Sequence, residues 1–248
     1  MNGRVAVVTG GTGTIGNEIC KHLAAMSCRV IALCRPRAVD CRTAEWMEAR
    51  KNEGYDMEAL ECDVTDFGHT STVFGDIARR YGGVDILVNA AGITSDATLR
   101  KMTVEQWQSV VRTNLDGVFN ATRCVIEGML DRGFGRVINI SSVNGQKGQF
   151  GQANYAASKA GIHGFTMSVA REVAKKGVTV NTVSPGYIES PMIMAVPEEH
   201  RAKILAEIPV GRFGRPSEVA RVVAFLADEE SGFITGADIS INGGQHMG

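Results

Sequence analysis

The sequence predicts an α/β fold in which a parallel sheet of about seven strands is covered by helices on both faces. Short, nearly continuous apolar runs alternate along the chain with longer segments whose apolar residues recur every three or four positions. These two patterns are typical of buried strands and amphipathic helices, and their alternation favours a parallel sheet between helical layers. The chain has 248 residues without a linker or repeat, so residues 1–248 are expected to form one domain.

The predicted elements can be placed along the chain from these patterns. Strands are expected at 5–9, 29–34, 57–62, 84–88, 137–140, 178–183 and 238–241. Helices are expected from about Ile15, at 66–81, within 103–132, up to Lys175 and at 216–227, where Pro216 suits a first helical turn. Three prolines interrupt the pattern at 191, 197 and 209, so residues 188–212 are expected to form a mobile flap with a short helix.

A glycine-rich turn joins the first strand to the helix that follows. Gly11, Gly13 and Gly16 have the G-x-G-x-x-G spacing, which lets the backbone approach a pyrophosphate at a helix N-terminus. The alternative is an ordinary glycine-rich turn. The residues expected to bind a dinucleotide here are Gly10, Thr12, Gly13, Thr14, Ile15 and Gly16.

The end of the second strand indicates which dinucleotide is bound. NAD enzymes usually place an acidic residue about 20 residues past the glycines, to hold the ribose 2′-hydroxyl. Here Arg35, Arg37 and Arg42 cluster, and the first acid is Asp40. Because arginine suits a 2′-phosphate by charge and by its forked donors, NADP(H) is the predicted cofactor and Arg35 a predicted ligand. A solvated basic loop is the alternative.

The chemistry is predicted to lie between Val137 and Lys159. Tyr155 and Lys159 are four residues apart in a helical segment and therefore share one face. A lysine ammonium beside a phenol favours the phenolate, which would make Tyr155 an acid usable near neutral pH. Ser142, at the strand end, would donate a hydrogen bond to the same substrate oxygen. An exposed tyrosine packed on a lysine stem is the alternative, since Tyr-x-x-x-Lys alone is a weak motif.

Composition excludes several classes of function. The net charge is −1 without a long charge run, which predicts neither a nucleic-acid nor a membrane-surface partner. No apolar stretch approaches a membrane span, and Val5 follows too closely on the N-terminus for a signal peptide. The six cysteines contain no Cys-x-x-Cys pair and are interpreted as reduced thiols of a cytoplasmic protein. The five scattered histidines predict no metal site.

Unusual residues recur where the predicted strands end, at 10–16, 63–64, 89–92, 142 and 185–188. Their order and spacing, together with Asn114 and Tyr155-x-x-x-Lys159, resemble the short-chain dehydrogenase/reductase family over the whole chain. The resemblance implies a Rossmann-like, doubly wound fold. It also implies a catalytic set of Asn114, Ser142, Tyr155 and Lys159, with Tyr155 as proton donor, Lys159 on the nicotinamide ribose and Asn114 in the proton relay. Further cofactor contacts implied by it are Asp63, Val64, Asn89, Ala90, Gly92, Tyr155, Lys159, Pro185, Gly186 and Ile188.

Two positions depart from the family pattern. Thr14 occupies a position that is usually glycine. A positive φ there would strain a threonine, whereas a position that is only close to the pyrophosphate would let the threonine hydroxyl donate a hydrogen bond. Ala90 replaces an asparagine beside the cofactor. Both departures bear on cofactor affinity rather than on the catalytic set.

Within the family, several segments are most similar to the acetoacetyl-CoA reductases of polyhydroxyalkanoate synthesis, notably 141–152, 177–188 and 242–248. This likeness implies NADPH-dependent reduction of acetoacetyl-CoA to (R)-3-hydroxybutyryl-CoA by a homotetramer. The tetramer would use helices at 103–132 and 152–175 for one interface, and the C-terminal strand and tail for another. The alternatives are a 3-oxoacyl-[acyl-carrier-protein] reductase and a catalytically silent, cofactor-sensing binding protein.

The substrate is expected to lie against the loop between Ser142 and Tyr155, because both ends of this loop would hold the carbonyl. The residues predicted to contact it are Ser142, Gln149, Phe150, Gln152 and Tyr187. Aromatic walls would limit the acyl chain, and amides would hold the thioester oxygen. For Gln149 and Gln152 the alternative is an ordinary solvated loop.

Overall fold

The computed structural model describes residues 1, 3–36 and 43–247. Its centre is one seven-stranded sheet in the order β3-β2-β1-β4-β5-β6-β7, with every neighbouring pair parallel. The strands are β1 Val5–Thr9, β2 Arg29–Cys34, β3 Met57–Glu61, β4 Ile86–Asn89, β5 Gly135–Ile140, β6 Val178–Pro185 and β7 Asp238–Ile241. This confirms the predicted parallel α/β sheet and its seven strands.

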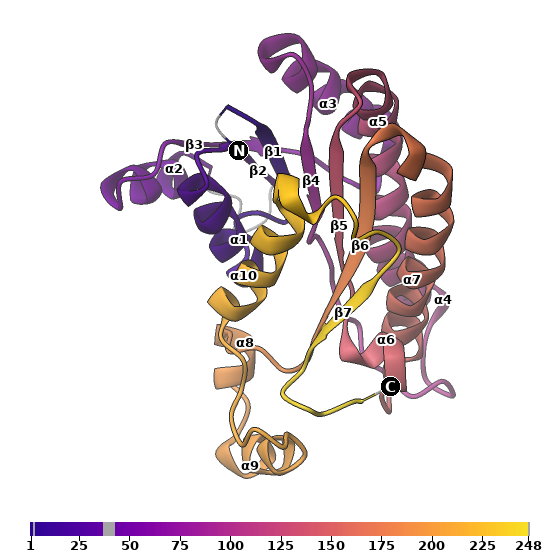
Figure 1. The fold of residues 1–248 in the computed structure, drawn as a ribbon. Helices are drawn as coiled ribbons and strands as arrows, with labels where there is room; N and C mark the ends of the chain where they lie inside the picture. Colours follow the sequence, from indigo (N-terminus) through magenta and orange to yellow (C-terminus); the bar gives the residue numbers. More distant parts are fainter. Residues whose placement is uncertain (2, 37–42, 248) are drawn as a thin grey trace.

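Helices cover both faces of the sheet (Figure 1). The longer ones are α1 Thr14–Ala25, α2 Thr43–Asn52, α3 Phe67–Tyr81, α4 Val104–Val111, α5 Gly117–Arg132, α7 Ala153–Val173, α9 Glu198–Ala206 and α10 Pro216–Ala227. Shorter segments are α6 Val143–Lys147, α8 Pro191–Met194, the π-helical η1 Arg112–Asp116 and the 3-10 turns η2 Ala174–Lys176 and η3 Glu229–Ser231.

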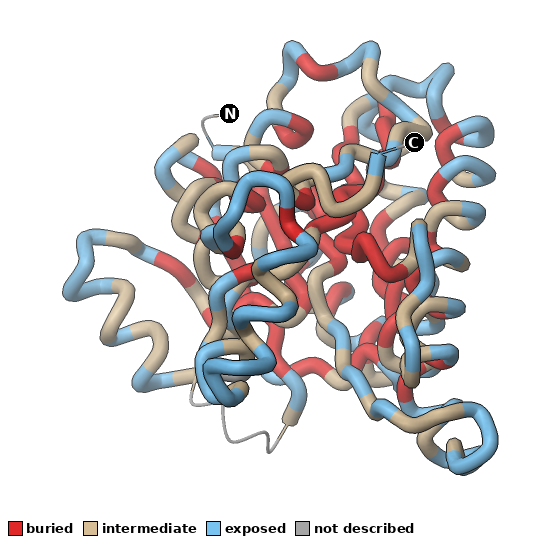
Figure 2. The backbone as a smooth tube through the Cα atoms, turned by 90° about the horizontal axis from the view of Figure 1, so that it is seen from below, coloured by how far each residue is buried: buried red, intermediate tan, exposed pale blue. Residues whose placement is uncertain are grey.

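Two apolar cores form because successive side chains of a strand face opposite sides of the sheet. Ala6 and Val8 of β1 pack in the layer with α1 and α10, whereas Val5 and Val7 pack in the layer with α3, α5 and α7. The most buried backbone therefore lies in the sheet itself, as the red central segments of Figure 2 show. Strand order reverses between β1 and β4, which places a crevice at the carboxyl ends of these strands.

The helices of the structure can be compared with those predicted from the sequence. The region 103–132, expected to hold one or two helices, holds two, α4 and α5, with η1 between them. α2 was not predicted, and among its described residues none is fully buried, so its sequence carries little amphipathic signal. The expected flap contains two short helices, α8 and α9, which extend away from the sheet (Figure 1). Its mobility stays a prediction.

The cysteines differ from expectation at one position. Cys34, at the end of β2, is disulfide-bonded, so the interpretation of all six cysteines as reduced thiols is wrong. Cys20, Cys28, Cys62 and Cys124 are free, and burial raises the pKa of the Cys28 and Cys62 thiols to about 11.

Within the described part of the chain, no helix is long and apolar enough to cross a membrane. No group of three or more histidine, cysteine or acidic side chains is arranged to hold a metal among these residues.

Candidate active site

The glycine-rich turn between β1 and α1 packs against the carboxyl end of β4. Gly10 has a φ of 65°, and a Cβ there would lie 2.9 Å from the Ala91 backbone. A Cβ on Gly16 would lie 2.2 Å from the Gly10 carbonyl oxygen. Both positions therefore require glycine, the first for its conformation and the second for the close approach of helix and turn.

The N-terminus of α1 opens at this turn. Gly13 is the N-cap residue and supplies no side chain to the first helical N–H groups. An uncapped helix start fits a pyrophosphate, because its N–H groups and the positive end of its dipole can face the anion. Thr14 is the first helical residue and is exposed. Its φ is not positive, so the departure from glycine introduces no backbone strain here.

The next strand ends carry the other predicted cofactor residues. Asp63 accepts hydrogen bonds from the N–H and hydroxyl of Thr65, at 3.0 and 2.8 Å. Val64 is buried. The Ala90 N–H is held by the Thr9 hydroxyl at 3.1 Å, so this segment is fixed through its backbone and not through the side chain that alanine lacks.

Two of the predicted cofactor residues, Asn89 and Arg35, differ in whether their side chains are accessible to a cofactor. The Asn89 side chain points into the protein, where it donates to Asn139 at 2.8 Å and to Thr122 at 3.2 Å; only its backbone is left to face a cofactor. Arg35 is exposed at the end of β2. Arg37 and Arg42 lie outside the described residues.

The four predicted catalytic residues come together beside the turn. A Cβ on Gly92 would lie 3.4 Å from Asn114 Oδ1 and 3.5 Å from Lys159 Nζ. The Lys159 ammonium lies 5.6 Å from the centre of the Tyr155 ring. Ser142 lies close enough to the Tyr155 phenol to lower the pKa of that group. The carboxyl ends of β4 and β5, η1 and α7 thus meet at one point.

Asn114 is placed by the π-helical segment η1. It is fully buried, its Oδ1 accepts from the Ile93 N–H at 2.8 Å, and its Nδ2 donates to the Ile93 carbonyl at 3.0 Å and to the Ser158 hydroxyl at 3.2 Å. π-turns inside helices are frequent at functional sites. Here the widened turn allows Asn114 to bind the loop after β4 to the catalytic helix α7.

Burial sets the protonation of the Tyr155–Lys159 pair. Burial raises the pKa of Tyr155 above its usual value, Ser142 opposes this, and Asp96 adds to it. Burial lowers the pKa of Lys159 to about 8, and its ammonium donates to the Ile140 carbonyl at 2.8 Å. Burial of the phenol therefore has the largest effect on the pKa of Tyr155, and the lowering of this pKa by Lys159 stays a prediction.

The predicted substrate residues are only partly brought together. Gln152 donates to Asp96 at 2.8 Å and accepts from Asn144 at 2.9 Å, which ties the loop to the catalytic region. Tyr187 is half-buried, and Gln149 is also half-buried. Phe150 is 85% exposed and forms no wall in this conformation.

The segment after β6 lies across the same edge of the sheet. Pro185 ends β6, and the Gly186 N–H donates to the Ile241 carbonyl at 2.9 Å. Ile188 is buried and pairs with Gly214. This segment therefore connects the strand ends to the helices α8 and α9.

Sequence reasoning missed Asn144, whose side chain is buried beside Ser142 and whose N–H donates to the Ser142 hydroxyl at 3.1 Å. It also missed the polar contacts of His163, although His163 follows Lys159 by four residues and so continues the face that begins with Tyr155. That spacing was the available signal.

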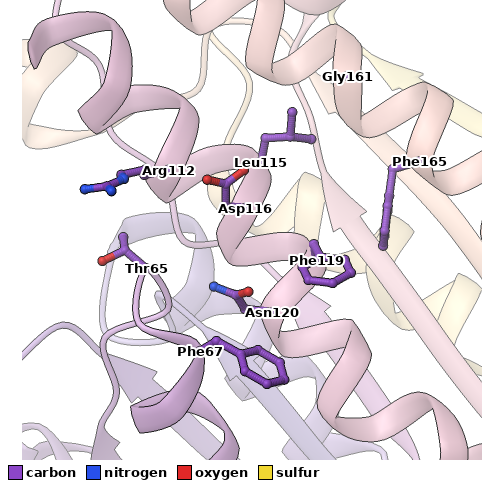
Figure 3. A pocket seen from close by; sticks show the side chains of 9 residues that line it. All are labelled: Thr65, Phe67, Arg112, Leu115, Asp116, Phe119, Asn120, Gly161 and Phe165. Atoms are coloured by element: carbon purple, nitrogen blue, oxygen red, sulfur yellow. The ribbon is translucent and has the colours of Figure 1, made fainter. Parts of the chain in front are cut away.

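A groove of about 680 Å³ lies elsewhere, where the start of α3, η1, α5 and α7 meet (Figure 3). Its lining residues are Thr65, Phe67, Arg112, Leu115, Asp116, Phe119, Asn120, Gly161 and Phe165. None of the four predicted catalytic residues lines it, so it is separate from the candidate active site.

Comparison with known proteins agrees with this geometry. The chain is 54% identical to the acetoacetyl-CoA reductase of Cupriavidus necator over 248 residues, covering 100% of both chains. It is 42% identical to the 3-oxoacyl-[acyl-carrier-protein] reductase of Escherichia coli over 100% of this chain and 99% of the relative. The crystal structure of gox2181 matches with a TM-score of 0.93 and 34% identity, covering 99% of this chain and 96% of that one. A model of the short chain dehydrogenases matches residues 4–201, and the chain belongs to this family.

Proposed function

We propose that the protein is an acetoacetyl-CoA reductase that uses NADPH and forms (R)-3-hydroxybutyryl-CoA. The observation that carries the proposal is the meeting of Ser142, Tyr155 and Lys159 beside the glycine turn. The relatives named acetoacetyl-CoA reductase support the substrate, since those of Cupriavidus necator and Allochromatium vinosum are 54% and 52% identical. The carrier-protein reductase of Escherichia coli is less similar, at 42%.

In this proposal the reduction is divided between the cofactor and the protein. The bound nicotinamide supplies the hydride. Ser142 orients the 3-oxo group, and the Tyr155 phenol donates the proton to its oxygen. The raised pKa of Tyr155 keeps the phenol protonated in the free protein, which is the form that a proton donor requires. Asn114 and Lys159 would then return a proton to Tyr155 from solvent.

The residues present fit a dinucleotide. The turn at Gly10 and Gly16 leaves no room for side chains, and the α1 N-terminus is uncapped. These features would hold the pyrophosphate. Lys159, beside Gly92, would hold the nicotinamide ribose. Arg35, exposed at the end of β2, would bind the 2′-phosphate that distinguishes NADPH.

The substrate is proposed to enter along the loop after Ser142. Gln152 is already oriented by its hydrogen bond to Asp96. Tyr187 is half-buried, and its pKa is raised first by burial, then by Glu207 and Asp96. Gln149 and Phe150 would reach the acyl chain only if the loop closes, because Phe150 is 85% exposed in this conformation.

A substrate panel tests the activity. With NADPH the parent should reduce acetoacetyl-CoA faster than the corresponding carrier-protein thioester or an eight-carbon 3-oxoacyl-CoA, and the product should be the R alcohol by chiral chromatography. Tyr155→Phe should lower kcat roughly 10²–10⁴-fold, because the proton donor is lost, with little change in the Kd for NADPH. Tyr55→Phe is the control. A preference for the carrier thioester, or near-parental turnover of Tyr155→Phe, would contradict the proposal.

The preference for NADPH over NADH tests the proposed role of Arg35 at the end of β2. NADPH should bind more tightly than NADH, and Arg35→Ala should weaken NADPH about tenfold through loss of a charge-assisted hydrogen bond. NADH affinity should stay unchanged, and Arg79→Ala, which alters an arginine whose side chain is 78% exposed on α3, serves as control. Fluorescence titration measures both constants. Equal affinities of the parent for the two cofactors would rule out the assignment.

Burial of Lys159 predicts a specific pH dependence of stability. Its pKa of about 8 in the folded protein lies below the usual lysine pKa of 10.5, so between these pH values the unfolded chain binds a proton that the folded protein does not. Stability should therefore rise with pH in this window. From pH 7 to 10, the free energy of unfolding of the parent should gain on the order of 2–3 kcal/mol over that of Lys159→Met. Urea denaturation without cofactor measures it, with Lys175→Met in parallel. A constant difference would refute the assignment.

We also propose a homotetramer. Large apolar side chains are exposed on the helices named for the first interface: Trp107, Phe119 and Met167 are 40%, 50% and 54% exposed. Phe67, which is 47% exposed, lines the same groove as Phe119. A second set lies toward the C-terminus: Phe225, Phe233 and Met247. Exposed apolar side chains favour association, and two distinct symmetric faces generate a tetramer.

Light scattering tests this assembly. The parent should have the mass of four chains, and Phe119→Glu should reduce it to that of two, because a charge would be buried in the first interface. Met194→Glu, on α8 and outside both faces, should leave the mass unchanged. A fully active monomeric parent would count against the tetramer.

A further inference from the structure

A cluster of polar side chains lies directly behind the catalytic residues. It joins the end of β5 to α6, α7, β6 and β7, and Ser141 and Ser184 within it are buried. Its members are Ser141, Gln146, His163, Ser184 and Asp238. None of them is among the residues that bind substrate or cofactor in the proposed function.

The hydrogen bonds of Ser141 indicate which ring nitrogen of His163 carries a proton. The Ser141 hydroxyl donates to the Lys159 carbonyl at 2.9 Å. A hydroxyl has one proton to donate, so the 2.8 Å contact between Ser141 Oγ and His163 Nε2 must be donated by the ring. Nε2 therefore carries a proton, and His163 acts as a hydrogen-bond donor to the residue before Ser142.

Asp238 supports the same arrangement from the other side. Its Oδ1 accepts from the Ser184 hydroxyl at 2.6 Å, and its Oδ2 accepts from Gln146 Nε2 at 2.7 Å. His163 Nε2 lies 3.5 Å from Oδ2 and 3.4 Å from Ser184 Oγ. A carboxylate only accepts hydrogen bonds, and the single hydroxyl proton of Ser184 is already donated to Asp238. The neighbours of His163 Nε2 named here are therefore all acceptors.

His163 also continues a stripe along α7. Tyr155, Lys159 and His163 follow at intervals of four and share one helix face. Lys159 Nζ holds the Ile140 carbonyl at 2.8 Å, and His163 holds Ser141 one turn further on. Two successive residues before Ser142 are thus fastened to two successive turns of the helix that carries Tyr155.

We propose that His163 is a positioning residue, which donates its Nε2 proton to Ser141 and thereby fixes the end of β5, and with it Ser142, relative to Tyr155 and Lys159. Asp238 holds the ring in this donating state. The inference rests on the proposed function, because it assigns His163 to the same reduction. His163 itself touches neither the substrate nor the cofactor.

The test compares two substitutions of His163. His163→Leu removes the donor, whereas His163→Gln can place an amide N–H near the position of Nε2. His163→Leu should lower kcat for acetoacetyl-CoA about 10- to 100-fold, the size expected when reacting groups are slightly misplaced, and leave KM within about twofold. His163→Gln should recover most of kcat. His200→Leu, on the exposed helix α9, is the control.

A second measurement needs no substrate. Amide hydrogen exchange of residues 140–147 should be faster in His163→Leu than in the parent and near parental in His163→Gln. If the parent does not reduce acetoacetyl-CoA, the proposed function fails while exchange still tests the positioning role. Parental kcat and exchange in His163→Leu would overturn the inference, as would a glutamine variant impaired as severely as the leucine variant.

Discussion

The attachment of the β5 end to α7 is the constraint on which the active site depends. Lys159 donates to the Ile140 carbonyl, and its own carbonyl accepts from the Ser141 hydroxyl. The helix therefore donates one hydrogen bond to the end of the strand, and the residue after the strand donates one to the helix. Such bonds are worth more in a buried site, where the alternative is an unpaired polar group. These two contacts also fix the position of Ser142, because it follows Ser141 immediately.

The same burial that strengthens these bonds controls the acid–base groups. Lys159 is 4% exposed, and removal of its ammonium from water lowers its pKa. Burial of the Tyr155 phenol raises the pKa of that group. Proximity of a lysine to a tyrosine in sequence does not reveal which effect is larger. In this protein desolvation dominates, because the ammonium is directed to a backbone carbonyl rather than to the phenol.

A second constraint is the close packing of the glycine turn on its neighbours. Gly10 lies against the end of β4 and Gly16 against Gly10 itself. This contact brings the N-terminus of α1 to the place where the strand order reverses. The proposed pyrophosphate site and the proposed catalytic residues consequently share one edge of the sheet, although at least 98 residues, from Gly16 to Asn114, separate them in sequence.

The sequence by itself determined the parallel sheet, most strand positions and the residues that gather at its carboxyl edge. Apolar runs and helical periodicity report burial directly, and glycines mark backbone that no other residue fits. Tertiary structure decided the rest. The π-turn at Asn114 depends on its contacts with Ile93 and Ser158, and the donor role of His163 depends on Asp238, which lies 75 residues away. Hydrogen-bond direction and desolvation arise from neighbours distant in sequence, which local patterns of residues do not encode.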